Sequence, residues 1–132
     1  MDAEKYLSEF YWHDRACKAI IIDCWKFKIK IQSTMISRHL SPTSQYVCLE
    51  NIKDGWLVFD DVQWFIIENE GRMPGDEINE VKVINIQDGI ISLEVYISAS
   101  SQILGKYPEV ILRIKCKGMH LEDPKRPGEI IY

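Results

Sequence analysis

The stretch FYWHDRACKAIIIDCW, at positions 10–25, combines residue types that could carry out nucleophilic catalysis. Cys17 could be the nucleophile of a cysteine hydrolase, with His13 as its base and Asp14 orienting the histidine. A reactive thiol needs exposure and an oxyanion hole nearby, whereas Cys17 leads directly into the apolar run Ile20-Ile21-Ile22. We therefore interpret His13 and Asp14 as a structural junction between a helix and a strand, and we keep the hydrolase as the less favoured alternative.

The other thiols and imidazoles do not have the spacing of a metal site. Cys24, Cys48 and Cys116 contain no closely spaced pair, and His39 and His120 are isolated in the sequence. Zinc sites, in contrast, group their ligands in close pairs. The chain also contains no glycine-rich phosphate loop and no HExxH or GxSxG motif. We predict free thiols, no metal, no cofactor and no enzymatic activity.

Carboxylates are concentrated between positions 60 and 80. Only Arg72 opposes them there, so the local charge is −6 whereas that of the whole chain is −4. A solvated loop could have this composition, but a surface of one sign can also steer a partner of the opposite sign. Our hypothesis is a docking surface for a basic partner protein, formed by Asp60, Asp61, Glu68, Glu70, Asp76, Glu77 and Glu80.

Three lysines form an alternative partner surface. Lys26, Lys28 and Lys30 share one face of a strand predicted over 26–38, and apolar residues occupy the other face. Such a basic face could contact phosphates, but no aromatic residues interleave with the lysines. Because lysine also keeps sheet surfaces soluble, the pattern disfavours nucleic-acid binding.

The elements that position these residues are mainly strands, because isoleucine and valine outnumber leucine and alanine. A short helix over about 2–11, capped by Asp2, precedes a β-rich body over about 17–119 and a proline-containing tail over about 120–132. The bend at Cys24-Trp25 and the Asp-Gly pairs at 54–55 and 88–89 predict hairpins. The prediction is a single, mainly β domain: a strongly bent antiparallel meander sheet or open barrel of about seven or eight strands.

The composition is typical of a soluble protein, with 46% hydrophobic and 27% charged residues. No apolar run approaches the roughly 20 residues of a membrane span, and the acidic start of the chain is unlike a signal peptide. We expect a cytoplasmic protein without membrane association, and the sequence leaves its oligomeric state open. An open barrel could instead bind a small molecule or lipid in a cavity lined by Trp25, Trp56 and Trp64.

The order of these segments resembles small bacterial immunity proteins of polymorphic-toxin and contact-dependent inhibition systems. A short helix and YWHDR are followed by AIIIDCW, KIKIQ, WLVFDDVQWF and EVILRIKCKGMHLED. The shared motifs are a His-Asp step before the first strand, here His13-Asp14, and a Phe-x-x-Val step, here Phe59-Asp60-Asp61-Val62. The resemblance covers most of positions 6–123. It implies a non-catalytic protein that binds and neutralises one cognate toxin domain.

Overall fold

The computed structural model describes residues 2–11, 15–39, 48–101 and 108–131. Among the described residues the fold is mainly β, with eleven strands and one short N-terminal helix, which confirms the predicted class. The described elements are α1 (Ala3–Ser8), β1 (Phe10–Tyr11), β2 (Cys17–Asp23), β3 (Lys28–Ser33), β4 (Met35–His39), β5 (Cys48–Lys53), β6 (Trp56–Asp60), β7 (Trp64–Glu68), β8 (Ile78–Gln87), β9 (Ile90–Ser98), β10 (Glu109–Cys116) and β11 (Gly118–Glu122).

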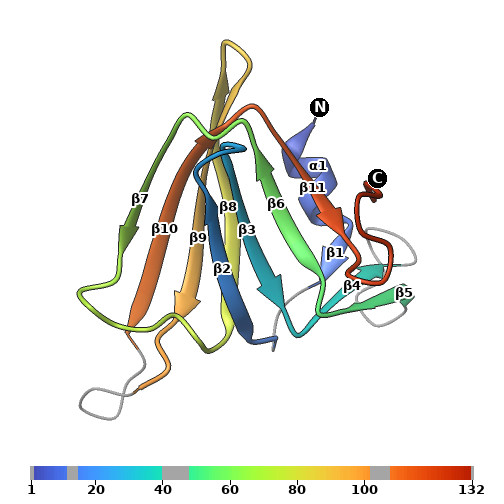
Figure 1. The fold of residues 1–132 in the computed structure, drawn as a ribbon, viewed down its shortest axis with the longest axis horizontal. Helices are drawn as coiled ribbons and strands as arrows, with labels where there is room; N and C mark the ends of the chain where they lie inside the picture. The colour runs from blue at the N-terminus through green and yellow to red at the C-terminus, as the bar shows by residue number, and fades with distance from the viewer. Residues whose placement is uncertain (1, 12–14, 40–47, 102–107, 132) are drawn as a thin grey trace.

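The strands form three antiparallel sheets rather than one meander, and the number of described strands, eleven, exceeds the expected seven or eight (Figure 1). Two sheets have four strands each, in the orders β11-β6-β3-β2 and β7-β10-β9-β8, and a small sheet has the order β1-β4-β5. They do not close into a barrel. The strands β2 and β7 therefore remain as edges, each hydrogen bonded to one neighbour.

Two of the predicted hairpins are present. A turn over residues 24–27 joins β2 to β3, and Asp88 and Gly89 join β8 to β9. Both residues of the second turn have positive φ, 54° and 75°, as an Asp-Gly hairpin turn requires.

The third predicted hairpin, at Asp54-Gly55, was wrong. Here β5 pairs with β4, whereas β6 pairs with β3 and β11, so the turn is a corner between two sheets. Gly55 is buried at this corner, and a Cβ atom on it would lie 3.0 Å from side-chain carbons of both Ile36 and Ile52. The glycine is thus required for close packing.

The N-terminal helix is anchored at both ends. Asp2 caps it by accepting a hydrogen bond from the backbone N–H of Lys5 at 3.0 Å, as predicted. Ala3 and Leu7 are buried in the core. The hydroxyl of Tyr6 accepts from the backbone N–H of Leu121 in β11 and donates to the carbonyl of Ile131. Since α1 also contacts β8, it covers the side of the molecule where β8 and β11 are the edge strands.

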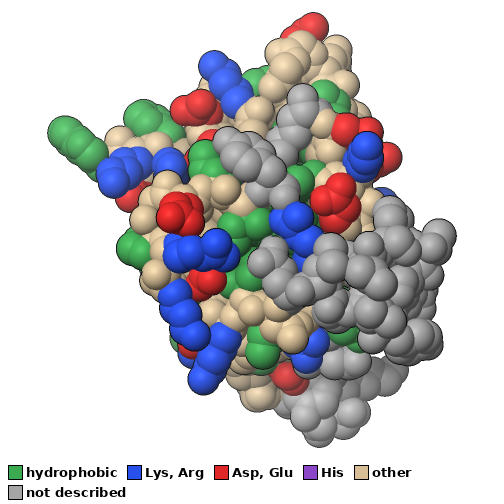
Figure 2. Space-filling view, turned by 90° about the vertical axis from the view of Figure 1, so that its right-hand side faces the viewer, with side chains coloured by type: hydrophobic (Ala, Val, Ile, Leu, Met, Phe, Trp, Pro, Cys, Tyr) green, Lys and Arg blue, Asp and Glu red, His purple; other side chains and the backbone are tan. Residues whose placement is uncertain are grey.

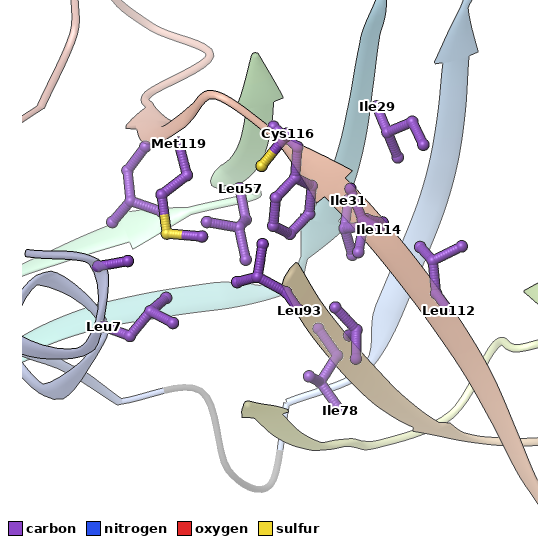
Figure 3. Packing of buried hydrophobic residues seen from close by; sticks show 14 of the residues in the cluster. Leu7, Ile29, Ile31, Leu57, Ile78, Leu93, Leu112, Ile114, Cys116 and Met119 are labelled. Carbon is purple, nitrogen blue, oxygen red and sulfur yellow. The ribbon is translucent and has the colours of Figure 1, made fainter. Parts of the chain in front are cut away.

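One hydrophobic core lies between the two four-stranded sheets. Figure 3 shows Ile29, Ile31 and Leu57 from one sheet beside Leu93 and Ile114 from the other. On β3, Ile29, Ile31 and Ser33 are buried while the intervening side chains are half-buried, which confirms the alternation that the sequence predicted there. Among the described residues, no helix is long and apolar enough to cross a membrane.

Candidate functional site

The thiol of the candidate nucleophile, Cys17, is buried. Cys17 begins β2, and burial raises its pKa to about 11, against a smaller lowering effect of its contact with the Ala19 carbonyl. At neutral pH the thiol is therefore protonated, whereas a nucleophilic cysteine must populate the thiolate. His13 and Asp14 lie outside the described residues. Cys17, Cys24 and Cys116 are free; Cys17 and Cys116 are buried, whereas Cys24 is exposed.

The structure disperses the acidic residues of positions 60–80. Asp60 and Asp61 lie before β7, whereas Glu68 ends it and Glu70 follows in the next turn (Figure 1). Between the two pairs lies β7, whose five residues span about 13 Å. Asp76 and Glu77 lie near the start of β2, where the carbonyl of Asp76 accepts a hydrogen bond from the N–H of Cys17. Glu80 lies on β8. These residues therefore do not form one continuous patch.

The lysine face is neutralised by neighbouring carboxylates. Lys28 lies 3.2 Å from Asp60, and Lys30 lies 3.4 Å from Glu122 and over the ring of Trp56. Lys26 lies in the exposed turn between β2 and β3 instead of on the strand. The side of the molecule in Figure 2 likewise intersperses acidic and basic side chains.

A buried histidine joins these two ion pairs into one network. His120, 6% exposed, directs Nδ1 to Asp60 at 2.6 Å and Nε2 to Glu122 at 3.0 Å. Burial raises the pKa of Glu122, but the bond from His120 and the charge of Lys30 outweigh it and hold that pKa below its usual range. Both nitrogens of His120 are engaged, so neither is free to bind a metal or accept a proton from a substrate. No group of three or more His, Cys, Asp or Glu side chains in the described residues is arranged so that it could hold a metal ion.

A second ladder of charges crosses the outer face of the other sheet. Arg113 on β10 bonds to Glu68 on β7 and, at 2.7 Å, to Glu94 on β9. Glu94 also accepts a bond from the Tyr96 hydroxyl at 2.9 Å. The bond from Arg113, and then that from Tyr96, lowers the pKa of Glu94. These bonds link three neighbouring strands and stabilise the sheet. Glu68 is therefore already paired with Arg113 inside the protein.

Another surface of the protein consists of exposed apolar side chains, which form no ion pairs. We call it the apolar rim: it consists of large hydrophobic side chains on β2, on the β2–β3 turn and on β7, namely Ile21, Ile22, Trp25, Phe27, Trp64, Phe65 and Ile66. Trp25 is 92% exposed and Phe27 64% exposed. An open groove of about 340 Å³ runs between the turn and β7 and is lined by Ile22, Phe27, Val62 and Phe65, among others.

Hydrogen bonds fix the turn that carries Trp25 and Phe27. Oδ1 of Asp23 accepts from the backbone N–H groups of Trp25 at 3.2 Å and Lys26 at 3.0 Å. The carbonyl of Phe27 accepts from the N–H of Val62 at 2.8 Å. Phe27 has φ of 56°, a conformation that is unfavourable for a bulky residue. The turn is thus held in one strained conformation with its aromatic side chains in solvent.

Trp25, Trp56 and Trp64 do not line an interior cavity. Trp25 is in solvent, Trp56 packs under Lys30 on the outer face of its sheet, and Trp64 packs under Lys115, whose Nζ lies 5.3 Å from the ring centre. The void lined by Ile31, Ser33, Ile36 and core residues of β8 and β9 has about 10 Å³ of free space. That volume is near the minimum for one water molecule. It does not favour the alternative function of an open barrel with an internal ligand.

The sequence interpretation missed the network around His120 and the apolar rim. His120 and Asp60 are 60 positions apart and meet because β11 pairs with β6. No local motif could have indicated that pairing. A signal for the rim did exist, since Trp25 and Phe27 occupy a predicted turn, where side chains are usually exposed.

Comparison with known proteins assigns the chain to a family but not to an activity. No curated protein and no solved structure matches it. The model of one family of unknown function matches residues 1–132. The chain therefore belongs to the DUF6258 family.

Proposed function

We propose that the protein acts by binding, without catalysis, as an immunity protein that neutralises a cognate bacterial toxin domain. One observation carries this proposal: exposed apolar side chains gather around one groove, which is lined by Ile22, Phe27, Trp64 and Phe65 among others. Of the eleven large hydrophobic side chains left exposed in the described part of the chain, seven belong to the apolar rim. Exposed apolar side chains gathered around a groove mark interaction sites.

The rim has the properties of a protein-binding surface. Tryptophan and other aromatic residues contribute most strongly to interfaces when a partner pocket buries them. A rigid turn loses little conformational freedom on binding, which favours affinity. Trp25 and Phe27 are exposed aromatic residues, and the bonds of Asp23 and Val62 hold their turn in place.

Other features support a binding role in the cytoplasm. The side chains of Lys28, Lys30, Arg113 and His120 are engaged in contacts within the sheets. The free thiols fit a reducing compartment. The resemblance to immunity proteins supplies the class of partner that we propose, a cognate toxin domain.

The test is protection by co-expression. The toxin domain encoded next to the gene is produced in a sensitive host with the native chain, with Trp25→Ser, or with Met73→Ser, and growth and the purified complex are measured. Met73 is a matched control, because it is 74% exposed and lies outside the rim. We expect the native chain and Met73→Ser to protect and Trp25→Ser to lose affinity by about 2 kcal/mol or more, the scale of a hot-spot residue. Failure of the native chain to bind or protect would refute the proposal.

A further inference from the structure

We propose that the free edge of β7 is a docking site for an extended strand of the partner protein, with an apolar centre and basic residues at both ends. This inference rests on the proposed function, that the chain acts by binding another protein. It adds how the partner binds and what its chemistry must be.

The backbone of β7 is available on one side. In the described part of the chain it pairs with β10 alone and ends its sheet (Figure 1). An edge strand presents N–H and C=O groups that can pair with a strand from another chain. The other edge at the rim, β2, is partly occupied, because the N–H of Cys17 already donates to the carbonyl of Asp76.

The side chains of β7 are apolar on both faces. Trp64 and Ile66 lie opposite Lys115 and Arg113 on the outer face, whereas Phe65 lies opposite the buried Ile114 and lines the groove. These three residues of β7 are 43%, 41% and 40% exposed, respectively. A strand paired with β7 would place alternate side chains on both faces, so it would cover the outer residues and the groove together.

The charges beside β7 define the ends of the partner strand. Asp61 precedes β7 and is exposed, and Glu70 follows it with its side chain 86% exposed. Glu70 has only a distant ion pair, 3.8 Å from Arg72. Lys115 opposes the negative charge near Trp64, so the Glu70 end should contribute more. Basic residues at the ends of the added strand would complement both carboxylates.

Binding of a short capped peptide of alternating valine and threonine residues, with lysines at both ends, tests this inference. We expect it to bind the full chain and to slow amide hydrogen exchange along Trp64–Glu68. A version with glutamates at the ends should bind much more weakly. Two further peptides are N-methylated, one at the valines and the other at the threonines. One of them should lose binding and the other should keep it, because alternate amides of a strand point to the same side.

Charge variants of the protein provide the matched comparison. Asp61→Asn combined with Glu70→Gln should lower the affinity for the lysine peptide by about two- to ten-fold, the range for exposed charges. Asp88→Asn should leave its binding unchanged. Asp88 is also an exposed carboxylate with positive φ, but it lies in the β8–β9 turn.

Several outcomes would overturn the inference. They are equal binding of the lysine and glutamate peptides, equal effects of the two N-methylations, or exchange protection on a strand other than β7. Self-association through β7 in sedimentation experiments would identify a second copy as the occupant. Binding to phosphatidylglycerol vesicles through Trp64 would identify a lipid surface. A toxin complex that forms through Trp25 without protecting β7 would refute strand pairing and leave the proposed function intact.

Discussion

Replacement of His120 by alanine should show how much the buried charge network contributes to stability. The variant loses hydrogen bonds to Asp60 and Glu122, of 2.6 and 3.0 Å. A hydrogen bond to a charged group contributes about 1.5–3 kcal/mol. Asp60 remains 29% exposed and can bond to water, so the two contributions do not add fully. We expect the free energy of unfolding to fall by about 2–4 kcal/mol, which a domain stable by about 5–15 kcal/mol can survive.

The pH dependence gives this prediction a second readout. The folded protein holds the pKa of Glu122 below its usual value of 4.5. The carboxylate therefore contributes stability at pH values above 4.5, and this contribution is lost as the pH falls through the lowered pKa. His120→Ala removes one of the groups that lower this pKa and leaves Lys30. The variant should therefore lose less stability than the native protein on acidification below 4.5.

Urea unfolding followed by tryptophan fluorescence, at neutral pH and at steps into the acid range, measures both effects. Lys18→Met is the control, because Lys18, on β2 at the other edge of the same sheet, forms an exposed ion pair with Asp54 at 2.8 Å. An exposed pair should change stability by no more than about 1 kcal/mol. Equal effects of the two variants, or an unchanged acid dependence in His120→Ala, would refute the stabilising role of the network.

Three further predictions concern thiols, packing and strain. A thiol reagent at neutral pH should modify the exposed Cys24 in the native protein and spare Cys17 and Cys116, because burial raises the pKa values of these two thiols to about 11 and 12. Mass spectrometry of the labelled peptides checks this prediction, and rapid labelling of Cys17 would contradict it. Gly55→Ala should lower the free energy of unfolding by about 1 kcal/mol or more, whereas Gly118→Ala, whose Cβ would meet no atom within 4 Å, should have little effect in the same urea assay. Phe27→Asn should retain or raise stability by up to about 1 kcal/mol, because asparagine tolerates positive φ, yet it should weaken toxin binding; a loss of stability would show that Phe27 supports the fold.

Local signals predicted those parts of the fold that local chemistry decides. The alternation of Lys28 to Ser33 fixed which face of β3 is buried, and Asp88-Gly89 fixed a hairpin because both residues accept positive φ. Asp54-Gly55 has the same residue types but forms a corner, because the pairing of β6 with β3 and β11 is decided by distant residues. The same limit applies to His120, whose partner Asp60 is supplied by strand pairing.

The candidate site was harder to predict, because exposure is a property of the assembled sheets. The acidic residues are close in the sequence, but β7 separates them in space. Lys28 and Lys30 alternate on β3 as expected, yet Asp60 on β6 and Glu122 on β11 neutralise them, and Lys26 lies in the preceding turn. A composition count therefore overestimated both charged surfaces.

The conformation of Phe27 supports a functional origin for the apolar rim. A bulky residue at φ of 56° costs on the order of 1–3 kcal/mol. Burial in the core does not offset this cost, because Phe27 is 64% exposed. Its position does place an aromatic ring at the mouth of the groove, and the bond from Val62 keeps it there. A partner that buries the ring would recover the cost, so strain and exposure at one residue both favour a binding surface over a structural one.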